Sequence, residues 1–228
     1  MTTNELERGP LVTADKQTFS GIRIVLIRHA ETEWNRTHRF QGRSDIPLNH
    51  NGKKQAQALA RALKGETFTA IYSSPLARAR ETARIVRSFH DSAPICEEEG
   101  LIEMDLGDFD GIGAQQWYRE HVDFREAWIR NPGSVRMPGG EGLQDVQKRA
   151  VDTLDRITMD YEPGSTLAIC SHNFVVLSIL CHALEISLDR FRDLRQVTAA
   201  FSVIRKERGG LRVELINEQS HLREFDKS

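Results

Sequence analysis

Two stretches of the sequence place imidazole and guanidinium side chains directly after short apolar runs. In the first, Arg28 and His29 follow the apolar residues Ile24 to Ile27. In the second, His172 follows the run Leu167 to Cys170 after one intervening serine. Such runs are typical of strands buried on both faces of a parallel sheet, although periodicity alone also allows a buried helical segment. Taken alone, Arg28 and His29 are better explained as a solvent-exposed loop start.

A third run, Thr69 to Ser74, has the composition of a short strand, and a helix is expected to begin near Pro75. Arg78 would lie in the first turn of that helix, where free backbone N–H groups and the helix dipole favour an anion. Arg80 and Arg84 are better explained as a solvent-exposed face. Arg78 is therefore the arginine of this segment that we expect to bind a ligand.

These polar groups are expected to meet in one crevice, because ligands bind at the carboxyl ends of the strands in open parallel sheets. Guanidinium groups match phosphate oxygens, and a neutral imidazole can attack phosphorus without first losing a proton. The sequence contains no P-loop, dinucleotide fingerprint or metal-ligand triad. The pattern therefore favours a site for a phosphoryl group in which no metal takes part.

The acidic segment around Glu103, Asp105, Asp108 and Asp110 is the source of the expected carboxylate. An EF-hand loop would require an acid where Leu106 stands, and a strand-borne acidic pair would require an apolar strand directly before it. Neither condition is met, so we expect no metal here. An acidic surface loop remains the alternative interpretation of the segment.

Five segments in this order resemble the motifs of the histidine phosphatase superfamily, also called phosphoglycerate mutase-like. They are IRHAETEWN, SSPLARARETA, LIEMDLGDFDG, MPGGEG and ICSHNF, and they extend from about Ile22 to Glu185. Any one of them is a weak signal, whereas five in the family's order are specific. Ala30, Gly142 and Asn173 differ from the residues that are common in the family, but none of these differences removes a reactive group.

The resemblance implies a role for each matching residue. His29 would be the nucleophile that becomes phosphohistidine, and Glu103 would donate a proton to the leaving oxygen. The other residues expected around the phosphoryl group are Arg28, Asn35, Gln41, Gly42, Arg78, His172 and Asn173. The acidic neighbours of Glu103 are expected to help keep it protonated, and the arginines would make a metal or other cofactor unnecessary.

Hydrolysis of a small phosphorylated metabolite, a phosphomonoester, is the expected reaction, because the interval that is longer in cofactor-dependent mutases is compact here. The resemblance extends to metal-independent phosphoserine phosphatases and to broad-specificity or α-ribazole phosphatases. Leu106 stands where this type of phosphoserine phosphatase carries a histidine, which weakens that assignment. A cofactor-dependent phosphoglycerate mutase and a non-catalytic phosphate-sensing module are the alternatives.

A cap over the crevice is expected from residues 107–141. Trp117, Trp128 and Met137 could form a wall on the substrate side. A carboxylate on the substrate could meet one of the arginines of this segment, namely Arg119, Arg125, Arg130 or Arg136. Ordinary helix faces and core positions would account for most of these residues equally well.

The composition and domain pattern describe a cytoplasmic protein without nucleic-acid or membrane partners. The formal net charge is −2, no basic stripe is visible, and no apolar run is long enough to span a bilayer. Cys96, Cys170 and Cys181 have no zinc-ligand spacing, which favours reduced thiols. Residues 1–20 are expected to form a polar extension, and residues 21–228 a single domain.

The alternation of strands and helices predicts an α/β fold. Helices are expected near Gly52 to Leu63, Leu76 to Phe89, Val146 to Ile157, Asn173 to Leu184 and Leu188 to Leu194. Gly209 and Gly210 mark a hairpin between the last two strands. We therefore predict a three-layer α/β/α sandwich, mostly parallel, phosphoglycerate mutase-like, with an antiparallel hairpin at one edge that could pair two subunits into a homodimer.

Overall fold

The computed structural model describes residues 21–223 and 225, so the predicted extension of residues 1–20 lies outside the described residues. A six-stranded sheet has the order β3-β2-β4-β1-β5-β6. Its strands are β1 (Ile22–Arg28), β2 (Ala70–Ser73), β3 (Ile95–Glu97), β4 (Thr166–Ser171), β5 (Phe201–Glu207) and β6 (Gly210–Glu218). The first four are mutually parallel, and β5 runs antiparallel to both β1 and β6.

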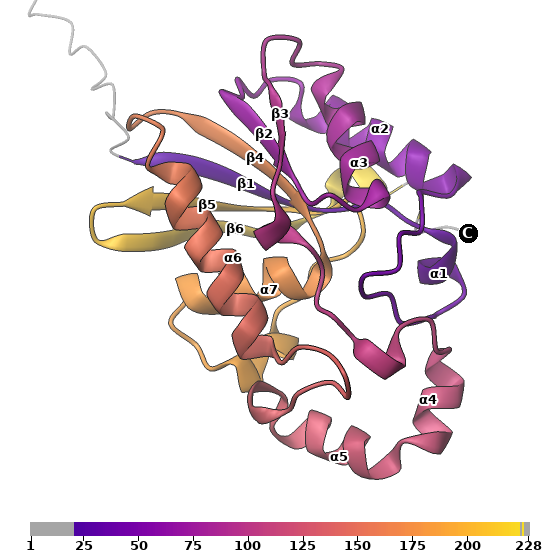
Figure 1. Ribbon diagram of the computed structural model, residues 1–228. Coiled ribbons are helices and arrows are strands. Elements are labelled where there is room, and N and C mark those ends of the chain that lie inside the picture. The colour runs from indigo at the N-terminus through magenta and orange to yellow at the C-terminus, as the bar shows by residue number, and fades with distance from the viewer. Residues whose placement is uncertain (1–20, 224, 226–228) are drawn as a thin grey trace, which may run out of the picture.

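Helices cover both faces of this sheet (Figure 1). The α-helices are α1 (Glu33–Arg36), α2 (His50–Leu63), α3 (Ala77–Arg87), α4 (Ala114–Glu120), α5 (Val122–Arg130), α6 (Leu143–Thr158) and α7 (Asn173–Ala183). Short 3-10 helices are Glu99–Leu101, Gly107–Phe109, Pro132–Ser134, Leu188–Asp193 and Ser220–Leu222. Helices α2 and α3 lie on one face and α6 and α7 on the other, which confirms the predicted three-layer sandwich with its edge hairpin.

Several boundaries differ from the sequence prediction. Helix α2 begins two residues before Gly52, because the Asn49 side chain caps the N–H of Gly52 at 2.7 Å. The segment predicted as a helix from Leu188 to Leu194 is a 3-10 helix that ends at Asp193. The sequence does not predict α1 or the three-residue strand β3, since neither is long enough to show a hydrophobic period.

The central strand β1 packs against both helical layers with alternate side chains. Ile24 and Leu26 belong to the apolar cluster that contains α6 and α7, whereas Val25 and Ile27 belong to the cluster that contains α2 and α3. All four side chains are fully buried. The four consecutive apolar residues from Ile24 to Ile27 thus contribute to two cores, which explains the unbroken apolar run.

The parallel strands β2, β4 and β1 are neighbours, and their carboxyl ends lie level with one another. The register pairs Arg28 with Ser171 and Ser73 with Cys170. The residues that follow these three strands therefore emerge at the same edge of the sheet. Helices α4 and α5, from the segment predicted as a cap, lie beyond the α6 and α7 layer at the foot of Figure 1.

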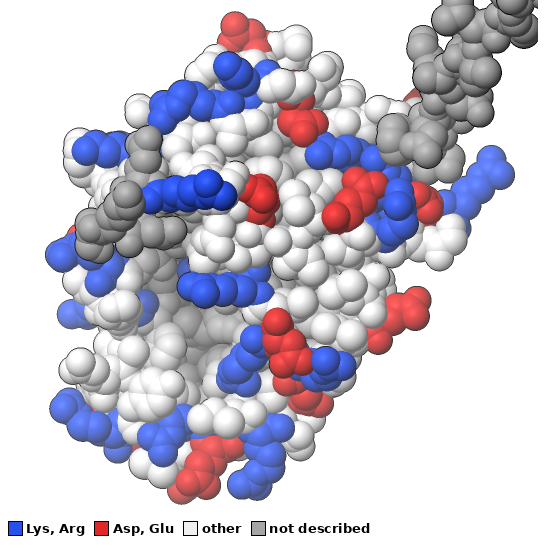
Figure 2. Space-filling view, turned by 180° about the vertical axis from the view of Figure 1, so that it is seen from behind, with Lys and Arg blue, Asp and Glu red and all other residues white. Residues whose placement is uncertain are grey.

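The described surface carries both signs of charge. On the face in Figure 2, Lys and Arg side chains are widely spread, and Asp and Glu side chains lie beside many of them. Among the described helices, none is both long and apolar enough to cross a membrane. Cys96, Cys170 and Cys181 are free thiols, and the last two are buried.

Gly52 offers a test of how α2 positions the loop after β1. A Cβ at this position would lie 2.0 Å from the backbone oxygen of Glu31, so Gly52→Ala must displace backbone. We expect the free energy of unfolding to fall by about 1–3 kcal/mol in urea denaturation. Gly65→Ala is the control, because no atom lies within 4 Å of the built Cβ. Equal stability of the two variants would contradict this packing.

Candidate active site

His29 follows β1 and is only 3% exposed. Its Nδ1 lies 2.7 Å from the backbone oxygen of Ala30. A carbonyl oxygen can only accept, so Nδ1 carries the ring proton and Nε2 keeps its lone pair. The alanine at position 30 therefore leaves the backbone carbonyl available to orient the ring.

His172, at the start of α7, is fully buried, and its ring centroid lies 5.2 Å from that of His29. Its Nδ1 accepts a hydrogen bond from Nε of Arg78 at 3.2 Å, and its Nε2 lies 2.8 Å from Oγ of Ser74. Arginine can only donate, so the ring proton is on Nε2 and points to Ser74. Both nitrogens of this imidazole are thus engaged and fix its orientation.

Backbone oxygens hold the two guanidinium groups in place. Arg78 is fully buried, and it donates from Nη1 to the carbonyl of Ser44 at 2.8 Å and from Nη2 to that of Gly42 at 2.7 Å. Arg28 donates from Nη1 to Oδ1 of Asn173 at 3.0 Å and to the carbonyl of Gln196 at 2.6 Å. Asn173, predicted as a substrate-binding residue, therefore contacts the arginine directly.

The loop predicted to surround the phosphate joins the same network. The amide of Gln41 satisfies both neighbours when its oxygen faces Arg78, at 2.9 Å from Nε and from Nη1, and its nitrogen donates to Thr32. The carbonyl of Gly42 accepts from Arg78. Asn35 lies in α1, and its Oδ1 accepts from the N–H and the hydroxyl of Thr32.

Glu103 is 3% exposed and lies beside the arginines. Its Oε1 accepts from the N–H of Met104 at 2.9 Å, and its Oε2 accepts from that of Phe174 at 3.4 Å. Burial raises the pKa of this carboxyl, although those N–H groups and the charges of Arg78 and Arg28 oppose the rise.

The prediction that acidic neighbours raise the pKa of Glu103 is wrong. Neither Asp105, Asp108 nor Asp110 contributes to the rise. Asp110 accepts from the N–H groups of Gly42 and Ser44, and Asp105 pairs with Arg43. These carboxylates bond to the surrounding loops. Burial of Glu103 itself is the dominant cause of its raised pKa.

The charges of the site are set by burial. Burial, followed by the charges of Arg78 and Arg28, holds the pKa of His29 well below its usual range. Burial and Arg78 do the same to the pKa of His172. Burial also lowers the pKa of Arg28 and of Arg78 to about 10, so both remain cations at neutral pH. Two cations thus surround two neutral imidazoles, an arrangement that suits an anion and a nitrogen nucleophile.

Sequence reasoning missed the residues that support this cluster. The carbonyl of Gln196 comes from the loop before β5, and that of Ser44 from a loop without a period or motif of its own. Thr82, one turn into α3, accepts from the N–H of Ala30 at 3.1 Å and donates to the carbonyl of Arg78. Backbone acceptors leave no signal in side-chain types, so only the fold reveals them.

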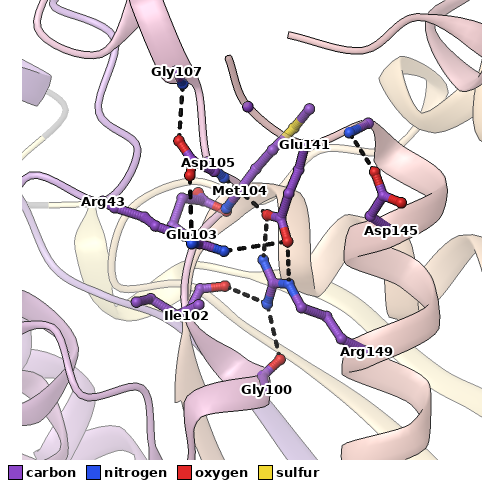
Figure 3. Close-up of polar contacts among 12 residues, drawn as sticks. Arg43, Gly100, Ile102, Glu103, Met104, Asp105, Gly107, Glu141, Asp145 and Arg149 are labelled. Atoms are coloured by element: carbon purple, nitrogen blue, oxygen red, sulfur yellow. Dashed lines mark hydrogen bonds and ion pairs between the residues drawn. The ribbon is translucent and has the colours of Figure 1, made fainter.

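Arg149 of α6 holds the segment that carries Glu103 (Figure 3). Its Nη1 donates to the carbonyls of Gly100 and Ile102 at 2.9 and 2.6 Å, on the N-terminal side of Glu103. Its other nitrogens pair with Glu141, at 3.0 and 3.1 Å. Glu141 in turn accepts from the N–H of Asp105 at 2.9 Å, on the C-terminal side.

This clamp also reaches the phosphate loop. Arg43, two residues after Gln41, lies 3.4 Å from Asp105 and 3.2 Å from Glu141 in the same network (Figure 3). Burial alone would raise the pKa of Glu141, but the bonds from Arg149 and from the N–H of Asp105 hold it below its usual range. Glu141 is therefore an anion that joins both loops to α6.

A cavity of about 340 Å³ adjoins Glu103. Its wall includes Phe174, whose N–H donates to the Glu103 carboxyl. Of the residues predicted for this wall, Trp117, Trp128, Met137 and Arg125 line it. The other predicted arginines, Arg119, Arg130 and Arg136, do not, because Arg119 lines a separate surface depression and Arg136 pairs with Asp145. Arg192, which lies outside the expected cap, takes their place.

Among residues 21–223 and 225, no cluster of His, Cys, Asp or Glu has the three members needed to hold a metal ion. The arrangement contains an unprotonated Nε2 on His29, two guanidinium groups, and a carboxyl whose pKa is raised by burial. These groups can bind a phosphoryl anion and exchange a proton with a leaving oxygen.

Known proteins share this fold and these motifs. The family model described as histidine phosphatase superfamily (branch 1) matches residues 24–219. Phosphoserine phosphatase 1 of Hydrogenobacter thermophilus is 31% identical over 204 residues, which cover 90% of this chain and 96% of that protein. The metal-independent phosphoserine phosphatase of Arabidopsis thaliana is 32% identical over 158 residues, which cover 68% of this chain and 66% of that protein. The solved structure of Bacillus stearothermophilus YhfR has a TM-score of 0.83 at 30% identity and covers 88% of this chain and 99% of its own.

The chain belongs to the histidine phosphatase superfamily. Within that family it is a phosphatase, as the named relatives and the shared fold indicate. The predicted recognition of the family from five short motifs is therefore confirmed.

The clamp predicts a pH-dependent loss of stability. In Arg149→Met the half-buried Glu141 keeps its charge with only Arg43 left to pair with it, and the carbonyls of Gly100 and Ile102 lose their donor, so the free energy of unfolding at pH 7 should fall by about 2–4 kcal/mol. Glu141 has a lowered pKa in the folded state, so its contribution is present at neutral pH and is lost as the pH falls through that pKa. In denaturant titrations, the difference in the free energy of unfolding between wild type and Arg149→Met should therefore become smaller toward pH 4.

The control for this prediction is Lys148→Met on the same helix. Lys148 pairs with Asp152, and both side chains are mostly exposed, so the change should be within about 0.5 kcal/mol. A loss for Arg149→Met that stays constant from pH 7 to pH 4 would contradict the role of the Glu141 charge.

Proposed function

We propose that the protein hydrolyses small phosphomonoesters without a metal ion, through a phosphohistidine on His29. The observation that carries the proposal is the hydrogen bond from Nδ1 of His29 to the Ala30 carbonyl, which leaves the Nε2 lone pair free in a pocket with two guanidinium groups. The lowered pKa of His29 supports the same conclusion, because the imidazole is neutral and nucleophilic at physiological pH.

In the first step Nε2 of His29 attacks phosphorus, and the bond from phosphorus to the ester oxygen breaks. The protonated Glu103 donates its proton to that oxygen, so the alcohol leaves neutral. The positive charge that develops on the phosphorylated ring is stabilised by the Nδ1–H bond to the Ala30 carbonyl. Arg28 and Arg78 hold the non-bridging oxygens, and His172 joins them by turning its Nε2–H from Ser74 Oγ to a phosphoryl oxygen.

In the second step a water molecule attacks phosphorus and the N–P bond breaks. The Glu103 carboxylate accepts the proton of that water, which restores the acid for the next cycle. Free inorganic phosphate and neutral His29 are the products. Gln41 and Gly42 act by holding Arg78, and Asn173 acts by holding Arg28. Asn35 is proposed as one of the residues that surround the same phosphate.

The two phosphatases among the relatives reported above support hydrolysis of a small phosphorylated metabolite. Two of the named relatives are phosphoserine phosphatases, one of them called metal-independent. Leu106, which replaces the histidine expected of a phosphoserine enzyme, lines the cavity beside Glu103. We therefore propose the phosphomonoester class and not phosphoserine itself.

The central test is phosphate release in EDTA from a panel that includes phosphoserine, 3-phosphoglycerate and p-nitrophenyl phosphate. His29→Ala should lower release by about a thousandfold or more, on the scale seen when a nucleophile is removed from a catalytic unit. His50→Ala, at an exposed position of α2, is the matched control and should keep wild-type rates. Isomerisation of 3-phosphoglycerate without release would favour a mutase, and phosphate binding without either reaction would favour a sensing module.

Glu103→Gln tests the acid separately from the nucleophile. An alkyl phosphate needs a proton on its leaving oxygen, whereas nitrophenolate leaves without one. The kcat for the alkyl ester should therefore fall about 100-fold to 10,000-fold, and that for p-nitrophenyl phosphate by at least about tenfold less.

The pH profile gives a second readout for the same variant. Because the raised pKa of Glu103 keeps it protonated, the wild-type kcat on the alkyl ester should fall as the pH rises through that pKa. This basic limb should be absent in Glu103→Gln. An equal loss on both esters, with the limb retained, would assign the proton donor to another group.

A further inference from the structure

The cavity beside Glu103 has a composition that the phosphoryl site does not explain. Five aromatic residues contribute to its wall, namely Phe40, Phe109, Trp117, Trp128 and Phe174. Its volume of about 340 Å³ is near the lower end of the roughly 300–1,000 Å³ range of small-molecule sites. One ring with a short substituent would fit such a space, whereas a highly hydrated polyol would lose its hydration there.

The position of Glu103 connects this cavity to the proposed chemistry. Its carboxyl accepts from the N–H of Phe174, a cavity residue, and it also interacts electrostatically with Arg78 and Arg28 of the phosphoryl site. Leu106, another cavity residue, lies against Gly42 of the phosphate loop. The group that receives the proton of Glu103 is the leaving alcohol, so this alcohol must extend from the phosphoryl site toward the cavity.

Two cations line this apolar cavity, and no carboxylate lines it. Arg192 lies over the rings of Trp128 and Phe191, at 5.3 and 4.6 Å from their centroids, and none of the described residues forms a hydrogen bond or ion pair with its guanidinium. Arg125 lies over the ring of Tyr118 at 5.6 Å and donates from Nη1 to the Tyr118 carbonyl. The aromatic faces orient both guanidinium groups while leaving N–H donors of Arg192 without a protein acceptor.

We propose that the substrate is a phosphomonoester whose alcohol carries an aromatic ring and, at the far end of that ring, a carboxylate that binds Arg192. This inference rests on the proposed function and names the substrate class of the same site. The ring packs among the aromatic side chains, and Arg125 adds a second cation to the cavity wall. A zwitterionic amino acid such as serine leaves the apolar wall uncovered and places an ammonium group near two cations.

The test uses three benzylic esters that differ only at the far end of the ring. They are benzyl phosphate, 4-carboxybenzyl phosphate and the neutral isostere 4-carbamoylbenzyl phosphate, with ethyl phosphate as the ester without a ring. Because all four release similar alcohols, differences in kcat/KM report binding of the leaving group. We expect benzyl phosphate to exceed ethyl phosphate, and the carboxylate to exceed the carboxamide by about tenfold, as a charged hydrogen bond implies.

Arg192→Met should abolish the advantage of the carboxylate over the carboxamide while retaining hydrolysis of benzyl phosphate within about threefold. The methionine keeps an apolar stem over Trp128, so the wall remains covered. Arg119→Met, on α4 but outside this cavity, is the matched control and should keep the full advantage. The effect should appear mainly in KM, because Arg192 does not reach the reacting atoms.

The outcomes separate this inference from the proposed function. Hydrolysis that requires His29 but shows no preference for the ring or the carboxylate would overturn the substrate class alone. A carboxylate preference that survives Arg192→Met would also overturn it. Absence of metal-independent release from every ester would instead overturn the proposed function on which the inference rests.

Discussion

The arrangement of the site depends on keeping two guanidinium groups charged beside two imidazoles that stay neutral. Like charges in a buried pocket repel, and each loses hydration, so Arg28 and Arg78 require compensation from groups that do not move. The carbonyls of Gln196, Ser44 and Gly42 provide it. Because backbone carbonyls carry no titratable charge, they stabilise the cations without neutralising them, and the positive potential remains available to a phosphoryl anion.

The sheet makes this arrangement rigid. Three neighbouring parallel strands end at one level, and each contributes the start of a loop or helix that carries a polar group into the pocket. The same potential that favours an anion lowers the pKa of His29 and opposes the rise that burial causes in the pKa of Glu103. One set of charges therefore gives a neutral nucleophile beside an acid, provided that the acid remains well buried. The Arg149 clamp secures that condition by bonding the backbone on both sides of Glu103.

The sequence was sufficient to predict the fold and most of the polar side chains that the structure brings together in one pocket. Apolar runs that end on Arg28, on Ser74 and before His172 report both strand burial and strand direction, so their convergence follows from parallel topology. It was not sufficient to predict partners that act through the backbone, such as Gln196, or the true reason for the raised pKa of Glu103. It predicted Arg125 but not Arg192 for the cavity, because Arg192 lies about fifty residues beyond the cap and reaches the cavity only through the packing of the Leu188–Asp193 helix beside α7.

The most direct measurement of the central claim is the chemical identity of the covalent intermediate. A radiolabelled phosphomonoester is mixed with enzyme, quenched in alkali within the first turnover, and the labelled peptide is sequenced by mass spectrometry. The account predicts a base-stable, acid-labile label on His29, and no label in His29→Asn. A label on a serine or cysteine, or turnover that persists in His29→Asn, would contradict the account.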